Sequence, residues 1–312
     1  MRSRVLLFVG ILLLLAACAS QPVARPEAEP TTVQSPSVDM AAASPTVEIT
    51  PTQAPKQAET STPRPNPDAW MKMPAVPSEI SERAQEIFAY GQTQGNHADV
   101  FMKIGDSNST TTWFLGPFGR GEYALGDEYA DLQPAIDTFQ ASFLRNSVTV
   151  GRGFNASTIL SSLWADKDQC EPKETPLDCE LRLVKPAYAL VMLGTNDYTR
   201  MEQFEPNMRL IIERLIDAGV VPILSTKGDN LEGDHQVNRT IAALADEYDI
   251  PLWNLWAALQ PLENHGAQAD DPAHLTWTGC YFDEPETMTY GWPWRNLTAL
   301  QVIDRVWRDV QS

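Results

Sequence analysis

Apolar residues follow two alternating patterns through most of the chain. Short apolar runs recur, and one of them, 187–193, is apolar throughout, as expected for a strand covered on both faces. Between them, apolar residues recur every three to four positions, as in a helix with one buried face. The predicted strands are 100–104, 147–150, 187–193, 220–225 and 251–256, and the predicted helices are 129–143, 157–164, 206–218, 235–248 and 297–310.

Strands that alternate with helices predict parallel βαβ units and a fold class of α/β, a three-layer α/β/α sandwich with a mainly parallel sheet. Residues 79–312 are numerous enough to form one domain with its own core. In such sheets ligands bind outside the carboxyl ends of the strands. Side chains that directly follow the predicted strands are therefore the first candidates for a site.

The first 78 residues have a different composition. Residues 1–18 begin with basic residues, continue with an apolar run too short to span a membrane, and end in Leu15-Ala16-Ala17-Cys18. This ending resembles the lipobox of bacterial lipoproteins, which implies cleavage before Cys18 and a lipid on that cysteine; an ordinary secretory signal is the alternative. Residues 19–78 are rich in Pro, Thr, Ala and Ser, which predicts a disordered tether. The predicted location is the cell envelope, outside the cytoplasm and anchored to the membrane by lipid.

Charge and cysteine content narrow the function further. The net charge of −18 argues against nucleic acid or an anionic lipid surface as a partner, because both require basic patches. In an exported protein, Cys170 and Cys179, which bracket a short polar loop, form a plausible disulfide. A zinc site is the alternative, although no CxxC pair occurs. Cys280 is left over and is expected to be a small buried residue.

Four residues suggest nucleophilic chemistry. Ser107 follows the predicted strand 100–104, Asn196 follows 187–193, and Asp271 lies three residues before His274. These residue types can supply a nucleophile, an oxyanion donor, an orienting carboxylate and a general base. Their order along the chain points to an ester hydrolase.

On these residues the chain resembles the SGNH, or GDSL, hydrolase family over roughly 98–310. Gly105-Asp106-Ser107 matches the block with the serine nucleophile, Gly194-Thr195-Asn196-Asp197 the block with the asparagine donor, and Asp271-Pro272-Ala273-His274 the block with the carboxylate and the base. The resemblance implies a Ser107–His274–Asp271 triad and an oxyanion hole. It implies an ester substrate, either an acetylated glycan or a short acyl ester, and requires no cofactor and no metal.

The second family block is less regular. The segment 152–158 resembles it, but the family glycine aligns with Ala156, and Gly153 comes earlier. The oxyanion hole implied by the resemblance therefore contains the backbone N–H of Ser107, an N–H from Gly153 or Ala156, and the side chain of Asn196. A non-catalytic surface lipoprotein that binds glycan or a partner protein with the same fold is the alternative function.

Other residues near the proposed base are candidates for the base itself, for sugar binding or for covering the site. His265, nine residues before His274, is the rival base. Trp277, Trp292 and Trp294 could stack on sugar rings, or simply pack in the core or at its rim. The Gly- and aromatic-containing segment 110–127, which follows Ser107, could form a wall over the site.

Overall fold

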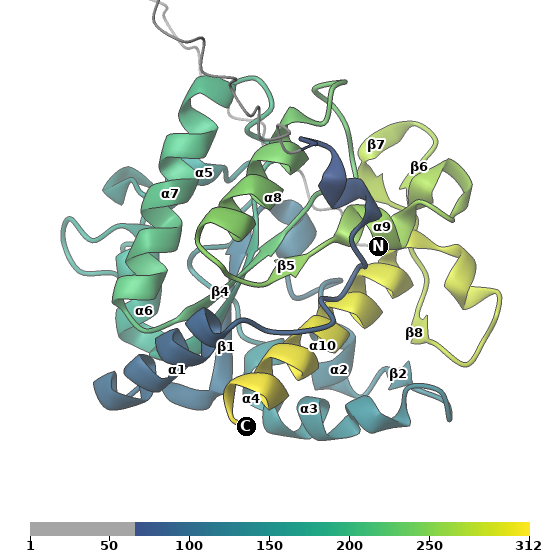
Figure 1. The fold of residues 1–312 in the computed structure, drawn as a ribbon, viewed down its shortest axis with the longest axis horizontal. Coiled ribbons are helices and arrows are strands. Elements are labelled where there is room, and N and C mark those ends of the chain that lie inside the picture. Colours follow the sequence, from purple (N-terminus) through teal and green to yellow (C-terminus); the bar gives the residue numbers. More distant parts are fainter. Residues whose placement is uncertain (1–65) are drawn as a thin grey trace, which may run out of the picture. The chain divides into compact units, whose positions relative to one another are not determined.

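The structure, a computed structural model, describes residues 66–312. A four-stranded parallel sheet forms the centre of this part of the chain (Figure 1). Its strands are β1 (His97–Gly105), β3 (Pro186–Met192), β4 (Val221–Ser225) and β5 (Leu252–Trp253), in the order β1-β3-β4-β5. Every residue of β3 is buried, because the strand is central and the sheet is covered on both sides.

Helices form the two outer layers. On one side, α1 (Glu82–Gln94) and α10 (Gly291–Val310) pack against each other and against the sheet. On the other, α7 (Met201–Asp217) and α8 (Gln236–Glu247) do the same, and Figure 1 shows this pair apart from α1 and α10. The residues that α8 buries recur at helical spacing: Val237, Asn238, Ile241, Leu244 and Ala245. The predicted α/β/α sandwich with a mainly parallel sheet is confirmed.

The remaining elements surround this frame. The shorter α-helices are α2 (Gly116–Arg120), α3 (Gln133–Thr138), α4 (Gln140–Phe143), α5 (Ala156–Ile159), α6 (Pro176–Val184) and α9 (Leu255–Leu259). The 3-10 turns are η1 (Ala69–Lys72), η2 (Ser107–Ser109), η3 (Ala130–Leu132), η4 (Ser162–Trp164), η5 (Glu263–Gly266) and η6 (Thr287–Thr289). Two small sheets pair β2 (Tyr123–Ala124) with β8 (Cys280–Tyr281), and β6 (Ala267–Gln268) with β7 (Asp271–Leu275).

The strand predicted over 147–150 is reduced to a single bridge between Val150 and Gly105. Hydrogen bonds from side chains take the place of the backbone hydrogen bonds that a full strand would make with β1. Ser147 Oγ accepts the N–H of Lys103 at 3.2 Å, and Thr149 Oγ1 donates to the carbonyl of Lys103 at 2.6 Å. These contacts satisfy the backbone of β1 without a full neighbouring strand, which sequence periodicity cannot reveal.

Two of the observed helices differ from the predicted ones near a proline. The helix predicted over 129–143 is divided into η3, α3 and α4, and Pro134 lies at the start of α3, where its missing N–H has no cost. The helix predicted over 206–218 begins earlier, at Met201, and contains Pro206. The buried side chain of Phe204 anchors the additional first turn.

The domain begins before residue 79, so the predicted tether boundary was wrong. Residues 66–81, here called the N-terminal strap, run along α8 and α9 (Figure 1). Trp70 is only 3% exposed, and its carbonyl and that of Met73 accept hydrogen bonds from Asn254 Nδ2 at 2.8 and 3.1 Å. These contacts, together with the ion pair between Asp68 and Arg239 at 2.9 Å, hold a segment whose average composition predicts disorder.

The predictions for the first 65 residues, including Cys18, the signal segment and the rest of the tether, lie outside the described residues. Within 66–312, no helix combines the length and the apolar character needed to cross a bilayer.

Candidate active site

Ser107 follows β1 at the edge of the sheet where the carboxyl ends of the strands meet. A Cβ on Gly105 would lie 2.2 Å from Ser109 Oγ, so the tight turn after β1 requires glycine. The Asp106 carboxylate accepts the N–H of Asn108 at 2.8 Å and caps η2, of which Ser107 is the first residue. Ser107 is half-buried and both of its neighbours are buried. The backbone of the turn is therefore held on both sides of Ser107, which is itself only partly buried.

Asp271 and His274 lie on β7 and contact each other. Nδ1 of His274 is 2.7 Å from Oδ2 of Asp271, and the two side chains are 43% and 48% exposed. A carboxylate at Nδ1 favours the tautomer that carries a proton there, which leaves Nε2 free to accept one. The other carboxylate oxygen accepts the N–H of Ala273 at 3.2 Å, which fixes the orientation of the aspartate.

A direct hydrogen bond joins the serine segment to the histidine segment. Asn108 Nδ2 donates to the carbonyl of Ala273 at 3.1 Å. The residue after Ser107 is thus bonded to the residue before His274, although 165 positions separate the two in the chain. The structure brings together the segments of the predicted nucleophile and the predicted base.

Asn196 lies in the loop that follows β3. Its Nδ2 donates to the carbonyl of Phe154 at 2.9 Å, which connects the third family block to the second. Asp197 reinforces this connection, because its carboxylate accepts the N–H groups of Ala156 at 3.0 Å and of Gly194 at 3.1 Å. Gly194 has φ of +127° and no room for a Cβ, which would lie 2.5 Å from Val237.

These contacts correct the proposed role of Ala156. It is fully buried and its N–H donates to Asp197, so that N–H is not free to stabilise an oxyanion. Gly153 is exposed, and its N–H has no partner among residues 66–312. The N–H of Ser107 likewise donates to no group in the described chain. Ser107 and Gly153 therefore keep free backbone donors, whereas Ala156 holds the two blocks together.

Residues 104–280 match the GDSL-like lipase/acylhydrolase family, which is more than half of the chain. The chain belongs to this family. It is accordingly an ester hydrolase of the SGNH, or GDSL, type. The chain matches none of the curated protein sequences with which it was compared.

Several solved structures resemble this family member. A lipolytic protein of the G-D-S-L family from Desulfitobacterium hafniense DCB-2 is 13% identical, with a TM-score of 0.43 and coverage of 65% of this chain and 98% of that one. A GDSL-like lipase from Bacteroides thetaiotaomicron VPI-5482 is 13% identical, with a TM-score of 0.39 and coverage of 72% and 99%. A catalytic mutant of an acetylxylan esterase from Geobacillus stearothermophilus is 15% identical, with a TM-score of 0.43 and coverage of 68% and 97%. Similarity of this degree carries no argument about substrate.

Buried charges lie directly beneath the family blocks. Burial raises the pKa of Asp197 to about 6, although the two N–H groups that it accepts act in the opposite direction. Burial also raises the pKa of Asp106, against the effect of the Asn108 N–H. Burial lowers the pKa of Arg295 to about 10, and its guanidinium lies over the ring of Phe114 at 5.0 Å. Ionisable groups that are shielded from solvent therefore lie next to the turn that carries Ser107.

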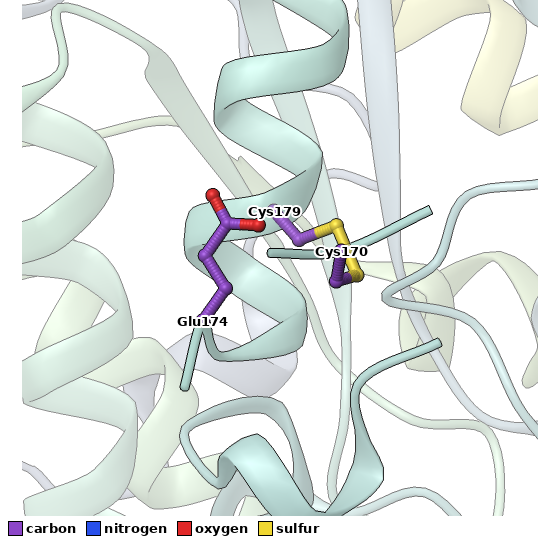
Figure 2. Close-up of side chains that lie close together, drawn as sticks. All are labelled: Cys170, Glu174 and Cys179. Carbon is purple, nitrogen blue, oxygen red and sulfur yellow. A yellow bond between two sulfur atoms is a disulfide. The ribbon is translucent and has the colours of Figure 1, made fainter. Parts of the chain in front are cut away.

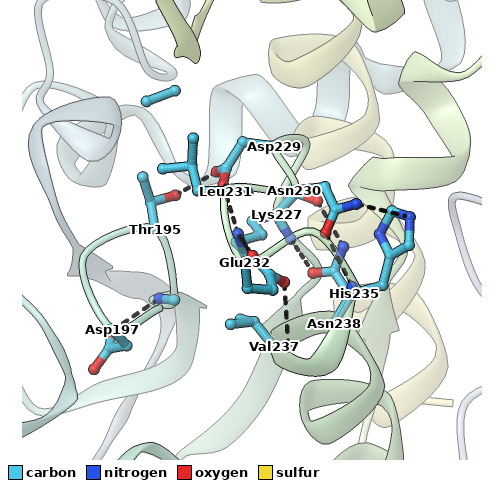
Figure 3. A network of polar contacts seen from close by, with 12 residues as sticks. Thr195, Asp197, Lys227, Asp229, Asn230, Leu231, Glu232, His235, Val237 and Asn238 are labelled. Carbon is cyan, nitrogen blue, oxygen red and sulfur yellow. Dashed lines mark hydrogen bonds and ion pairs between the residues drawn. The ribbon is translucent and has the colours of Figure 1, made fainter. Parts of the chain in front are cut away.

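A buried ion network supports the Asn196 loop from behind, and the sequence analysis missed it. Thr195 Oγ1 donates to Asp229 at 2.7 Å, and Lys227 Nζ lies 2.5 Å from both Asp229 and Glu232 (Figure 3). All three charged side chains are about 5% exposed or less. Their position just after β4, at the same sheet edge as Asn196, is the signal that could have identified them.

A small cavity of about 20 Å³ lies between this network and the serine turn. Asp106, Thr195, Lys227 and Arg295 are among its lining residues, and Nε of Arg295 is buried without a hydrogen-bond partner in the described chain. That volume is about enough for one water molecule. A far larger cavity of about 950 Å³ lies away from the site, between the N-terminal strap and α8.

The other histidines lie in different surroundings from His274. His265 is exposed in η5 with φ of +53°, and no carboxylate among residues 66–312 pairs with its ring. The ring of His235 packs against those of both Trp70 and Trp256, with centroids 6.0 and 5.7 Å away. His97 is exposed at the start of β1, at the opposite end of that strand from Ser107. Only His274 of these four has an aspartate at its ring nitrogen.

Cys170 and Cys179 are joined by a disulfide at the start of α6 (Figure 2). Glu174 lies close to both sulfurs, and its carboxylate and the two sulfurs are all within 4.8 Å of one another, a spacing that suits a metal ion. Bonded sulfurs are not thiolates, and the Glu174 carboxylate is paired with Arg182 at 2.7 Å, so these residues are already engaged. Cys280 is buried, and burial raises the pKa of its thiol to about 12.

Proposed function

We propose that Ser107 attacks the carbonyl carbon of an ester while His274 takes the proton of the serine hydroxyl. Asp271 holds the imidazole in the required tautomer and stabilises its cation. The observation that carries this proposal is the 2.7 Å contact between His274 and Asp271, on a segment hydrogen-bonded to the residue beside Ser107. His274 then gives the proton to the leaving alcohol, and an acyl-enzyme remains.

Water resolves the acyl-enzyme in the second half of the reaction. His274 accepts a proton from the water, the hydroxide attacks the acyl carbon, and the Ser107 oxygen leaves with the proton. The oxyanion of each tetrahedral intermediate is stabilised by the backbone N–H of Ser107, the N–H of Gly153 and the side chain of Asn196. Free donors at Ser107 and Gly153 support this assignment. These steps use no metal and no organic cofactor.

The proposed setting is the cell envelope. The apolar segment before Cys18 and the Pro- and Thr-rich residues after it support export and attachment of a lipid at that cysteine. The disulfide between Cys170 and Cys179 is consistent with an oxidising compartment. The proposed substrates are acyl or acetyl esters in the envelope or in the surroundings of the cell, including those of glycans.

Hydrolysis of p-nitrophenyl acetate by the purified full chain tests the reaction, with Ser107→Ala as the paired variant. We expect wild-type turnover and loss of nearly all of it in the variant. A fluorophosphonate probe should label wild type and not Ser107→Ala, because only an activated serine reacts. Absence of both turnover and labelling in a folded wild-type protein would favour the non-catalytic surface lipoprotein instead.

A further inference from the structure

Two exposed tryptophans contact each other beside the proposed catalytic residues. The ring centroids of Trp113 and Trp277 lie 5.0 Å apart with an interplanar angle of 47°, and the residues are 43% and 59% exposed. Neither indole N–H has a partner among residues 66–312. Large apolar side chains gathered at the surface commonly mark a binding site.

The backbone holds both tryptophans firmly despite their exposure. Asn296 spans the first segment, because its Nδ2 donates to the carbonyl of Trp113 at 3.0 Å and its Oδ1 accepts the N–H of Leu115 at 2.7 Å. On the second segment, the N–H and hydroxyl of Thr276 both donate to the carbonyl of Gly266, at 2.8 and 3.0 Å. The rings are thus exposed on a fixed frame, which lowers the entropy cost of binding.

Each tryptophan comes from a segment that carries a proposed catalytic residue. Turn hydrogen bonds connect Ser107 to Thr110 and Thr110 to Trp113. Trp277 lies three residues after His274. Since Asn108 bonds to Ala273, the two segments lie side by side, and the aromatic pair spans them. A ligand on the pair is therefore next to the proposed nucleophile and base.

The other tryptophans near the base do not share these properties. Trp292 is 6% exposed and packs beneath the site, and Trp294 is half-buried with its indole N–H donated to the carbonyl of Met288 at 2.8 Å. Of the three tryptophans that the sequence suggested for sugar stacking, only Trp277 is available. Trp113 joins it from the segment that follows Ser107.

We propose that Trp113 and Trp277 bind the sugar ring of a neutral, O-acylated glycan, the alcohol side of the ester. This inference rests on the proposed function. The C–H bonds on the face of a pyranose ring carry partial positive charge and suit the negative face of an indole, while the free indole N–H groups can donate to sugar hydroxyls. The net charge of −18 of the chain as a whole disfavours an anionic glycan as the ligand.

A binding measurement separates this inference from the catalytic proposal. In a Ser107→Ala background, which prevents turnover, the affinity for an acetylated xylo-oligosaccharide is measured by titration calorimetry. We expect Trp277→Ala to weaken binding about tenfold and Trp277→Phe to retain most of it. The matched control is Tyr90→Ala, an exposed aromatic on α1 at the opposite edge of the sheet, which should leave the affinity unchanged.

The alternative is that the two tryptophans bind the acyl chain of the ester instead of the sugar. Esters of a small alcohol test this alternative, because they lack the sugar. With intact Ser107, Trp277→Ala should hydrolyse ethyl acetate and ethyl octanoate in the wild-type ratio. If glycan affinity is unchanged and only octanoate hydrolysis falls, the tryptophans line an acyl site and the inference is overturned. If wild type binds the glycan through Trp277 but hydrolyses no ester, the inference stands and the catalytic proposal fails.

Discussion

The two halves of the proposed active site are held in different ways. Asp271 and His274 lie on a short strand of a two-stranded sheet, and both side chains are nearly half exposed. Asn196 follows the central strand β3, and buried carboxylates fix the residues on either side of it. The difference suggests that changes to the proton-transfer pair alter rate alone, whereas changes behind Asn196 alter rate and stability together.

Removal of the imidazole should have the largest effect on activity. His274→Ala should lower kcat about 10⁴- to 10⁶-fold, because no other group accepts the Ser107 proton. The free energy of unfolding should change by less than about 0.5 kcal/mol, because the side chain is exposed. Ester hydrolysis and urea denaturation check the two expectations. His265→Ala is the control, and loss of activity in that variant with a fully active His274→Ala would move the base to His265.

Asp271→Asn should lower kcat about 10⁴-fold, because an amide no longer selects the tautomer with a proton on Nδ1. Steady-state kinetics on p-nitrophenyl acetate give the loss, and circular dichroism shows whether the fold is kept. We expect an unchanged spectrum and a KM close to that of wild type. A variant with full activity would mean that the 2.7 Å contact has no role in catalysis.

On the buried side, Asn196→Ala should lower kcat about 10²- to 10³-fold through the loss of one oxyanion donor. Thr195→Val should give a smaller loss, about tenfold, and should also destabilise the fold because Asp229 loses a buried donor. Thr195→Ser restores the hydroxyl and should recover both properties. If Thr195→Val and Thr195→Ser behave alike, the hydrogen bond to Asp229 does not position the loop.

The buried side should also respond to pH through Asp197. Burial raises the pKa of this carboxyl from 3.8 to about 6, so the folded state binds its proton more tightly than the unfolded state does. The contribution of Asp197 to stability is therefore lost as pH rises from about 4 to above 6, by at most about 3 kcal/mol. Urea denaturation across this range gives the free energy of unfolding of wild type and of Asp197→Asn. As the pH rises, the wild type should lose stability relative to the variant. A constant difference would contradict the raised pKa.

Removal of the disulfide should have the smallest effect on activity. Cys170→Ala with Cys179→Ala should lower the free energy of unfolding by about 2–3 kcal/mol, because the bond closes a loop of nine residues. Activity should be unchanged, since α6 carries none of the proposed catalytic residues. Intact mass after alkylation without reductant should find both thiols of the wild type blocked. Two freely alkylated thiols would contradict the bridge.

Most of the sheet could be predicted from sequence because buried strands have a continuous apolar signal, as in β3. The proposed catalytic residues could be predicted because Ser107, Asn196 and the Asp271–His274 pair occur in short local blocks. The use of the Ala156 N–H by Asp197 could not, because that contact joins residues 41 positions apart. The same holds for Thr195 with Asp229 and for Trp113 with Trp277. Each depends on which loops the sheet brings to one edge.

The N-terminal strap has a mechanical consequence. Its hydrogen bonds to Asn254 lie just beyond the end of β5, on the same edge of the sheet as Ser107 and Asn196. We therefore expect a pull on the chain ahead of residue 66 to be resisted first by the ion pair between Asp68 and Arg239 and then by the contacts of Trp70, before it reaches the central strands. We expect these contacts to keep tension in the preceding chain from displacing the loops that carry Ser107 and Asn196.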